Sequence, residues 1–297
     1  MTNGIVNVYK EKGYTSFDVV AKMRGIFHQK KIGHTGTLDP DAEGVLPVCL
    51  GNATKVCELL TDKDKEYEAE LLLGVVTDTQ DISGEVLSER EVTVSEAEVR
   101  EVILAFQGEY LQVPPMYSAL KVNGQKLCDL ARQGITVERK ARPVTIHEIE
   151  ILDVKLPVVR MRVHCSKGTY IRTLCQDIGE KLGCGGCMQS LLRTRVSEFR
   201  IEDALRLSEI EEKLKKGEAD FVHSVDSVFL KYPRLVAPVQ AQKLVDNGNR
   251  IPAVMFPDAD FSERVRMYDS EEHFIGIYSY MQDTKDYKPV KLFFDRA

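Results

Sequence analysis

Apolar and polar residues alternate with the two-residue period of a half-buried strand in two stretches of the chain. Residues 67–73 read Tyr-Glu-Ala-Glu-Leu-Leu-Leu, and residues 159–165 read Val-Arg-Met-Arg-Val-His-Cys. Successive side chains of a strand point to opposite faces, so we expect Arg160, Arg162 and His164 to share one face of their strand. A shorter apolar run predicts another strand near the N-terminus, at Ile5, Val6 and Val8.

Apolar residues with helical spacing follow capping signals elsewhere. Thr15-Ser16 precede a predicted buried stripe, and Ser95 with Glu98 forms a capping box for a helix over residues 95–106 that we expect Gly108 to close. Two further segments are expected to be helical, residues 171–182 and residues 203–230, the second including Leu205 to Lys216. The first stripe consists of Val19, Val20 and Met23.

The character of the chain changes after Pro233, where short β-like runs replace helical segments. This predicts an α+β fold with two domains, residues 1–232 and a small β-rich domain over residues 233–297. A chain of 297 residues with 43% hydrophobic and 29% charged residues can bury two cores. No stretch reaches the roughly 18 apolar residues that span a bilayer, and the first residues do not resemble a signal peptide, so we expect a cytoplasmic location.

The seven cysteines form an odd set without a secretory signal, which predicts reduced thiols. Cys184 and Cys187 have the CxxC spacing of metal ligands. A second CxxC or a His pair does not follow in the sequence, so packing of these thiols is favoured over zinc binding.

The formal net charge of −6 disfavours a general nucleic-acid coat, so any RNA-binding face must be a local basic patch. Each candidate taken alone is more often a solvated surface than a binding site. The candidates are Lys30-Lys31, Lys121 with Lys126, and Arg139-Lys140 with Arg142.

Residues 33–47 place Asp39 near their centre, among glycines, prolines and threonines. Gly33, Gly36 and Gly44 permit unusual backbone angles, while Pro40 biases Asp39 away from helical angles. We therefore expect a rigid loop, the kind of segment that displays catalytic groups. A Leu-Asp-Pro sequence by itself is more often a turn with a capping aspartate.

This stretch resembles the motif of the TruB family of tRNA pseudouridine synthases, G-H-x-G-x-L-D-P-x-A-x-G-x-L-P, with every fixed position filled. The resemblance covers most of residues 3 to 200. It implies a pseudouridine synthase catalytic domain with an extended mixed β-sheet flanked by helices. It also implies that Asp39 is the essential aspartate in converting uridine to pseudouridine, because the base must leave C1′ and rejoin through C5. Asp39 either attacks C1′ or takes a ribose proton.

The resemblance also assigns roles to residues in later blocks. It implies that Tyr67 stacks on a flipped target base and that Asp81 orients polar groups, although by themselves they would be a core residue and a turn former. It places Tyr170, a candidate acceptor or relay for the C5 proton, and Arg172, a partner that holds Asp39 ionised, beside Asp39. An isolated Tyr and Arg would otherwise be packing and surface.

Three further assignments concern RNA and the pocket wall. Leu191 would be an apolar wall, and His34 an RNA contact in the space that the flipped base vacates. Lys121 and Arg132 belong to a basic segment, about Lys121 to Arg142, that fits an RNA-gripping loop; the bland alternative is an exposed insertion. The chain departs from the family pattern at Glu11, Cys128, Leu192 and Ser197, where the family has proline, tyrosine, arginine and glycine.

The resemblance predicts isomerisation of uridine 55 in the T loop of tRNA, without metal or organic cofactor. Short motifs after Pro233 resemble the RNA-binding PUA domain; an independent structural β module is the alternative. The expected partner is the tRNA T-stem loop. We expect the protein to be a monomer that binds no membrane and needs no obligatory protein partner. The alternatives are an RNA-binding folding factor for tRNA and a synthase acting on ribosomal RNA, which the block from Pro114 to Lys121 and the G-T-L-D-P form of the motif disfavour.

Overall fold

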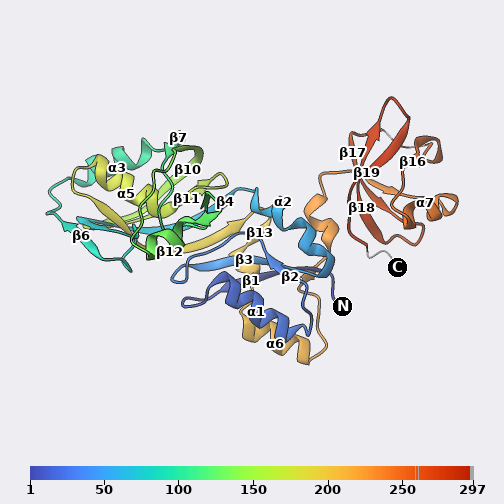
Figure 1. The fold of residues 1–297 in the computed structure, drawn as a ribbon, viewed down its shortest axis with the longest axis horizontal. Coiled ribbons are helices and arrows are strands. Elements are labelled where there is room, and N and C mark those ends of the chain that lie inside the picture. The colour runs from blue at the N-terminus through green and yellow to red at the C-terminus, as the bar shows by residue number, and fades with distance from the viewer. Residues whose placement is uncertain (258, 260, 295–297) are drawn as a thin grey trace.

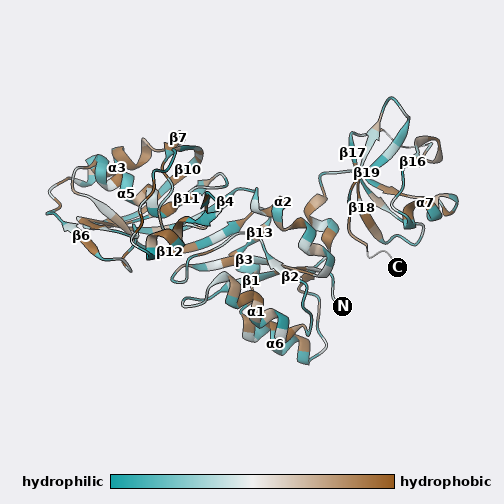
Figure 2. Cartoon of the chain, in the orientation of Figure 1, coloured by the Kyte–Doolittle hydropathy of each residue, from teal (hydrophilic) through white to brown (hydrophobic). Residues whose placement is uncertain are grey.

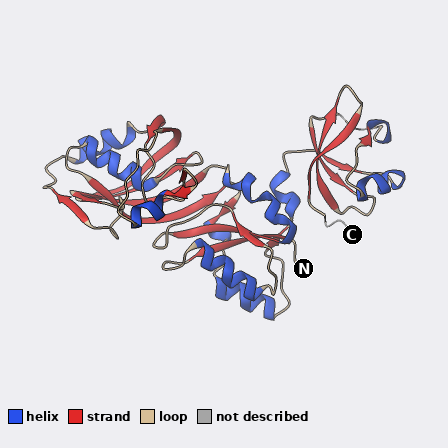
Figure 3. Cartoon of the chain, viewed as in Figure 1, coloured by secondary structure: helices blue, strands red, loops and turns tan. Residues whose placement is uncertain are grey.

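Two β-sheets organise the chain in the computed structural model, which describes residues 1–257, 259 and 261–294 (Figures 1 and 3). Within these residues the larger sheet has ten strands, in the order β14-β1-β3-β12-β4-β11-β10-β7, with β2 beside β3 and β13 beside β12. Its strands are β1 (Gly4–Lys10), β2 (Ile32–His34), β3 (Glu43–Leu50), β4 (Lys65–Leu73), β7 (Gly108–Gln112), β10 (Arg142–Lys155), β11 (Val158–Cys165), β12 (Gly186–Val196), β13 (Phe199–Arg200) and β14 (Val222–His223).

Strand β12 joins the two halves of this sheet. It runs parallel to β3 on one side and antiparallel to β4 on the other, so the expected mixed sheet is present. The strands predicted from alternation are confirmed as β1, β4 and β11. In β11 the apolar residues are buried, while Arg160, Arg162 and His164 face the other way, as expected.

Helices cover the two halves of the sheet separately (Figure 1). Helices α1 and α6 pack beneath β1 and β3, whereas α3 and α5 pack on the half that contains β4, β10 and β11. Figure 2 shows hydrophobic and hydrophilic residues alternating along α1 and α6, as amphipathic helices require. The α-helices are α1 (Ser16–Ile26), α2 (Cys57–Thr61), α3 (Glu96–Leu104), α4 (Leu127–Arg132), α5 (Ile171–Lys181), α6 (Leu207–Lys215) and α7 (Gln242–Asp246).

Both predicted capping signals are confirmed. Thr15 caps α1 in a capping box with Asp18, and Ser95 caps α3 in a box with Glu98. The end predicted for α3 was wrong, because this helix is capped by Ala105 and Gly108 begins β7 with a φ of +110°.

Residues 203–230 are not helical throughout, contrary to expectation. Helix α6 ends before Gly217, whose φ of +79° turns the chain away from the helix. The segment then returns to the large sheet, where the two residues of β14 pair with β1. The short 3-10 helix η3 (Val225–Phe229) follows. Residues 222 and 223 therefore form an edge strand of the large sheet in place of the expected helix.

The second sheet has five strands in the order β15-β17-β18-β19-β16, so the β-like texture after Pro233 is confirmed. Phe229 of η3 packs against it through Phe274 and Phe293, with ring centroids 6.2 Å and 5.6 Å away. The strands are β15 (Arg234–Val236), β16 (Ile251–Pro252), β17 (Arg264–Tyr268), β18 (Phe274–Met281) and β19 (Asp286–Leu292). Two small hairpins complete the fold: β5 (Val75–Thr77) with β6 (Val86–Glu89), and β8 (Lys121–Val122) with β9 (Gln125–Lys126).

Helix α5 lies directly against the start of β12, so Gly179 has no room for a side chain. A Cβ there would stand 2.2 Å from Gly186 N and 2.3 Å from Gly185 C. Gly179→Ala should therefore lower the free energy of unfolding by about 2 kcal/mol or more, measured by urea denaturation.

The control is Gly25→Ala in α1, where a Cβ would meet nothing within 4 Å. At that position alanine is favoured over glycine in a helix, so the substitution should raise the free energy of unfolding by up to about 1 kcal/mol. Stabilisation by both substitutions would contradict the close packing of α5 on β12.

Candidate active site

Asp39 lies on the irregular segment between β2 and β3, as expected. Gly36 and Gly44 have φ of +113° and +104°, angles that favour glycine. Gly33 does not; it lies in β2, where a Cβ would stand 3.2 Å from Cys57 Sγ, so its role is close packing. The loop is tied to α1 because Leu38 N donates to Ser16 Oγ at 2.9 Å.

A buried lysine holds the other side of this loop. The Lys10 ammonium, at the end of β1, donates to Pro40 O at 2.9 Å, Ala42 O at 2.5 Å and Glu11 O at 3.2 Å. Burial lowers the pKa of Lys10 to about 8. Sequence reasoning missed this residue, whose only signal was a lysine ending an apolar strand.

Arg172, the second residue of α5, contacts Asp39 from the opposite half of the sheet. Its Nε lies 2.9 Å from Asp39 Oδ2 and its Nη2 lies 3.3 Å from Oδ1, so the expected ion pair is present. The guanidinium also donates to Thr79 O at 3.0 Å and Tyr117 O at 2.8 Å. Its side chain is 6% exposed, and these four contacts fix its position.

Opposing effects act on the pKa of the Asp39 carboxylate. Burial raises its pKa above the ordinary carboxyl value, Arg172 opposes that rise, and Asp81 adds to it. The net direction is upward, so Arg172 offsets only part of the effect of burial. The side chain nonetheless keeps an open edge, 39% exposed, that a substrate can reach.

Asp81 also contacts the guanidinium of Arg172. Its Oδ2 lies 3.7 Å from Arg172 Nη1, while its Oδ1 accepts bonds from Thr79 Oγ1 at 2.8 Å and Ser83 N at 3.0 Å. Tyr170 caps the N-terminus of α5, where Gln112 binds both its backbone N and O, and burial raises the pKa of its phenol. Both predicted residues therefore lie beside Arg172.

Tyr67 of β4 is buried next to a second cation that the sequence did not single out. Burial raises the pKa of the Tyr67 phenol, and the positive charge of the nearby Arg193 guanidinium opposes that rise. Arg193 is 1% exposed, and its Nε donates to Val45 O at 2.7 Å. Its Nη2 reaches Gly36 O at 3.4 Å. One side chain thus links the Asp39 loop to the aromatic ring.

His34 and Leu191 lie at the borders of this group. His34 ends β2, half-buried, and burial lowers the pKa of its imidazole, which favours a neutral ring. Leu191 of β12 packs against the core cluster that contains Leu38 and Tyr67.

Lys121 and Arg132 are not among the described residues that hydrogen bond to or ion-pair with Asp39 or Arg172. They lie in the insert between β7 and β10, residues 113–141, and line an open surface hollow of about 650 Å³. Tyr117 O, at the base of the insert, contacts Arg172. Arg139 Nη1 donates to Pro114 O at 3.0 Å, so Arg139 helps close the base of the insert.

Cys184 and Cys187 are both buried beneath α5, and their thiols are reduced. Cys184 Sγ lies 3.4 Å from the adjacent Gly185 O. The side chains serve as packing groups at the start of β12.

Comparison with known proteins identifies the family of the chain. Residues 24–171 match the model of the TruB family pseudouridylate synthase N-terminal domain, and residues 172–241 match the tRNA pseudouridylate synthase B C-terminal domain. The chain is 58% identical over 305 residues to tRNA pseudouridine synthase B of Lachnoclostridium phytofermentans, covering 98% of this chain and 99% of that one. It is 44% identical over 294 residues to the protein of the same name from Clostridium acetobutylicum, covering 98% and 99%.

Solved structures share the fold. A chain of a Cbf5-Nop10-Gar1 complex superposes with a TM-score of 0.72 at 26% identity, covering 99% of this chain and 85% of that one. A chain of an H/ACA RNP bound to a substrate RNA containing 2'-deoxyuridine has a TM-score of 0.71 at 24% identity, covering 99% and 86%. Fold, motif and matches together define a pseudouridine synthase, which is an isomerase. More narrowly, the chain belongs to the TruB family.

The ion pair between Arg172 and Asp39 should affect how the reaction rate depends on pH. A positive charge beside Asp39 favours its ionised form, so removing that charge should raise the pKa of Asp39 further. For a reaction that requires the carboxylate, the acid limb of the pH–rate profile should move to higher pH in Arg172→Met. The rate at the optimum should fall about 100-fold or more. Single-turnover rates measured across pH check both effects.

Arg172→Lys is the matched control, because it keeps the charge but loses the forked contacts. Its acid limb should lie close to the parent position even though its rate falls. An acid limb at the parent pH in Arg172→Met would show that Arg172 does not influence the ionisation of the catalytic group.

Proposed function

We propose that this protein isomerises uridine to pseudouridine at position 55 in the T loop of tRNA. The observation that carries the proposal is the Asp39 carboxylate, fixed by Arg172 on one side and open on the other. The relatives named tRNA pseudouridine synthase B, similar over nearly their full length, support tRNA as the substrate.

Asp39 would act on the ribose of the target nucleotide. A nucleophile needs an ionised, oriented oxygen, and a proton acceptor at the ribose needs the same. The two contacts from Arg172 leave the lone pairs on the open edge of the carboxylate available to C1′ or to a ribose proton. Lys10 and Arg193 hold the loop backbone and so limit the movement of Asp39 between these steps.

The surrounding residues would handle the detached base. Tyr67 supplies an aromatic face on which a flipped base can stack, and Leu191 an apolar wall beside it. Tyr170, at the start of α5, would take or relay the proton that leaves C5 after the base rejoins the sugar. Asp81 would orient polar groups through the shared guanidinium, and His34, as a neutral ring, would contact RNA.

We further propose that residues 1–232 form the catalytic domain and residues 233–297 a PUA-like domain that binds RNA. The enzyme would work in the cytoplasm as a monomer, without an obligatory protein partner and without a metal or organic cofactor in catalysis. An isomerisation consumes no second substrate, which agrees with the absence of a nucleotide-binding fingerprint from the sequence. Among the described residues no helix is long and apolar enough to cross a membrane.

Asp39→Asn should abolish pseudouridine formation, below about a thousandth of the parent rate, while preserving the fold and tRNA binding. An amide has the same shape but is a poor nucleophile and base. The assay incubates purified protein with unmodified tRNA and maps pseudouridine chemically, with a tRNA carrying cytidine at position 55 as the substrate control.

Asp41→Asn is the matched variant, since Asp41 is an exposed carboxylate two residues away on the same loop. It should retain activity. Turnover by Asp39→Asn would remove Asp39 from the chemistry, and an intact parent that binds and refolds tRNA without forming product would favour the folding-factor alternative.

The exposed cations of the insert should supply part of the affinity for tRNA. Log affinity should fall linearly with log salt, with a slope of roughly −0.7 to −0.9 per phosphate contacted. Replacing Lys121, Lys126 and Arg132 together by alanine should make the slope shallower by about two to three such contacts, measured by filter binding at several salt concentrations. The rate at saturating tRNA should change little.

Lys213, Lys215 and Lys216 on α6 provide a control triple with the same loss of charge. Their ammonium groups already pair with acidic neighbours, so their replacement should leave the slope near the parent value. Equal slopes for the parent and the insert triple would place the RNA on another face of the protein.

A further inference from the structure

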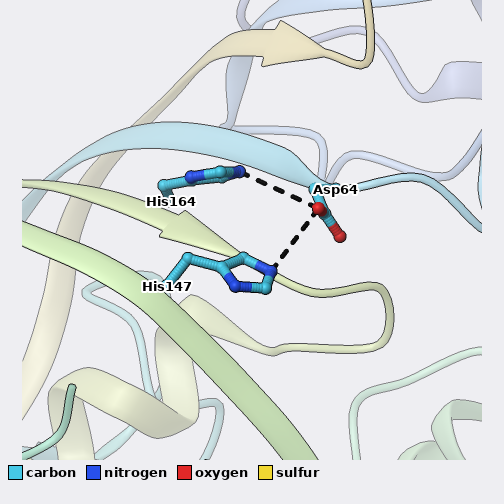
Figure 4. A group of neighbouring side chains, drawn as sticks. All are labelled: Asp64, His147 and His164. Carbon is cyan, nitrogen blue, oxygen red and sulfur yellow. Dashed lines mark ion pairs between the residues drawn. The ribbon is translucent and has the colours of Figure 1, made fainter. Parts of the chain in front are cut away.

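Two histidines and one aspartate form a cluster that the proposed reaction does not use (Figure 4). His147 Nε2 lies 3.4 Å from Asp64 Oδ2, and His164 Nε2 lies 4.0 Å from the same oxygen. Figure 4 shows both imidazoles pointing at this carboxylate from neighbouring strands. One ligand atom from each residue lies within 4.8 Å of the others.

The position of His147 in β10 puts its side chain on this face. The register between β10 and β11 shifts between Ile146 and Glu148, and Ile146 and Ile149 on either side are both buried. Because His147 follows the buried Ile146, which pairs with Cys165, it lies on the outward face beside His164, and the extra residue at the shift puts Glu148 on the same face. Asp64 directly precedes β4, whose Glu66 pairs with His164 across β11 and β4. Three neighbouring strands thus converge on one point.

The donor set has the chemistry of a transition-metal site. Imidazole nitrogens and a carboxylate oxygen are the usual ligands of zinc and related divalent ions, which accept three protein ligands and a water. The ligand atoms already lie close together, and the cluster retains one exposed side for the water. The nearby Arg195 cation lies 3.6 Å from the Glu66 carboxylate, which offsets its charge.

A second observation comes from His164 itself. Its Nε2 atom is inaccessible to solvent, and the part of the chain that the structure describes gives it no hydrogen-bond partner. The ring of His147 lies against it, with centroids 4.7 Å apart. A buried imidazole nitrogen without a partner is costly, and a bound cation would satisfy it.

We propose that Asp64, His147 and His164 bind a divalent transition-metal ion of the zinc type, with water completing its coordination. The site lies on the face of the sheet opposite Tyr67, because His164 pairs with Glu66 whereas Tyr67 pairs with Val163. The ion connects β4, β11 and β10 and stabilises the folded chain without taking part in the reaction.

The experiment titrates the metal-free full-length protein with Zn²⁺ by calorimetry and with Co²⁺ by absorption spectroscopy. We expect one equivalent to bind and to raise the Tm by several degrees at saturation, because the ion binds the folded state. The cobalt spectrum should show d–d bands without a thiolate charge-transfer band, which separates this site from cysteine thiols. Pseudouridine formation should be the same with and without the ion.

His147→Ala, His164→Ala and Asp64→Asn should each weaken binding by about tenfold or more. Asp64→Asn keeps the shape of the side chain and guards against a variant that merely misfolds. His273→Ala is the matched control, because His273 forms a His–Asp pair with Asp269 at 3.2 Å elsewhere and should leave binding unchanged.

Three results would overturn the proposal. The first is parent affinity weaker than about 1 mM. The second is binding that all three cluster variants leave intact, and the third is a thiolate charge-transfer band in the cobalt complex. Loss of activity on chelation, restored by Zn²⁺, would overturn the separation of the site from the chemistry.

Discussion

The buried guanidinium of Arg172 connects four segments that are distant in the sequence. It contacts the Asp39 carboxylate, the backbone at Thr79 and Tyr117, and the carboxylate of Asp81, all from the first turn of α5. Removing a carboxylate that pairs with this buried guanidinium would be destabilising, since it leaves a buried charge without full compensation. The two halves of the sheet, the β5–β6 hairpin and the base of the insert must therefore be in place together for the site to exist.

Two more buried cations support the same loop without pairing directly with its carboxylate. Lys10 donates to carbonyl oxygens on one side of the loop, and Arg193 donates to carbonyls at Gly36 and Val45 on the other. Their hydrogen bonds hold the backbone while burial and Arg172 act in opposite directions on the pKa of Asp39. A carboxylate with reduced hydration and fixed geometry is suited to reacting with a ribose, because little solvent must be reorganised.

Departures from the family pattern can be read in the same physical terms. Ser197 stands where the family has glycine and adopts a φ of +53°, a conformation that costs a non-glycine residue roughly 1–2 kcal/mol. Its backbone N donates to Asp64 O at 3.2 Å, so the strained residue lies next to the proposed metal cluster. Glu11, in place of proline, forms an ion pair with Arg206 at 2.5 Å that joins the first turn to α6.

Local sequence determined the elements whose signals are local: the alternating strands β4 and β11, the capping boxes of α1 and α3, and the irregular Asp39 loop. The motif around that loop pointed to Asp39, and later blocks of the same family resemblance pointed to Tyr67, Tyr170 and Arg172. It could not reveal Lys10 or Arg193, because a buried cation is recognised by the distant carbonyls that it binds. Nor could it place His147 beside His164, since only the pairing of Ile146 with Cys165 between β10 and β11 brings the two rings together. The end of the helical segment after α6, the two-residue strand β14 and the close contact of Gly179 with β12 were likewise decided by tertiary packing, which overrides local preference where a sheet edge or a neighbouring backbone competes for the same space.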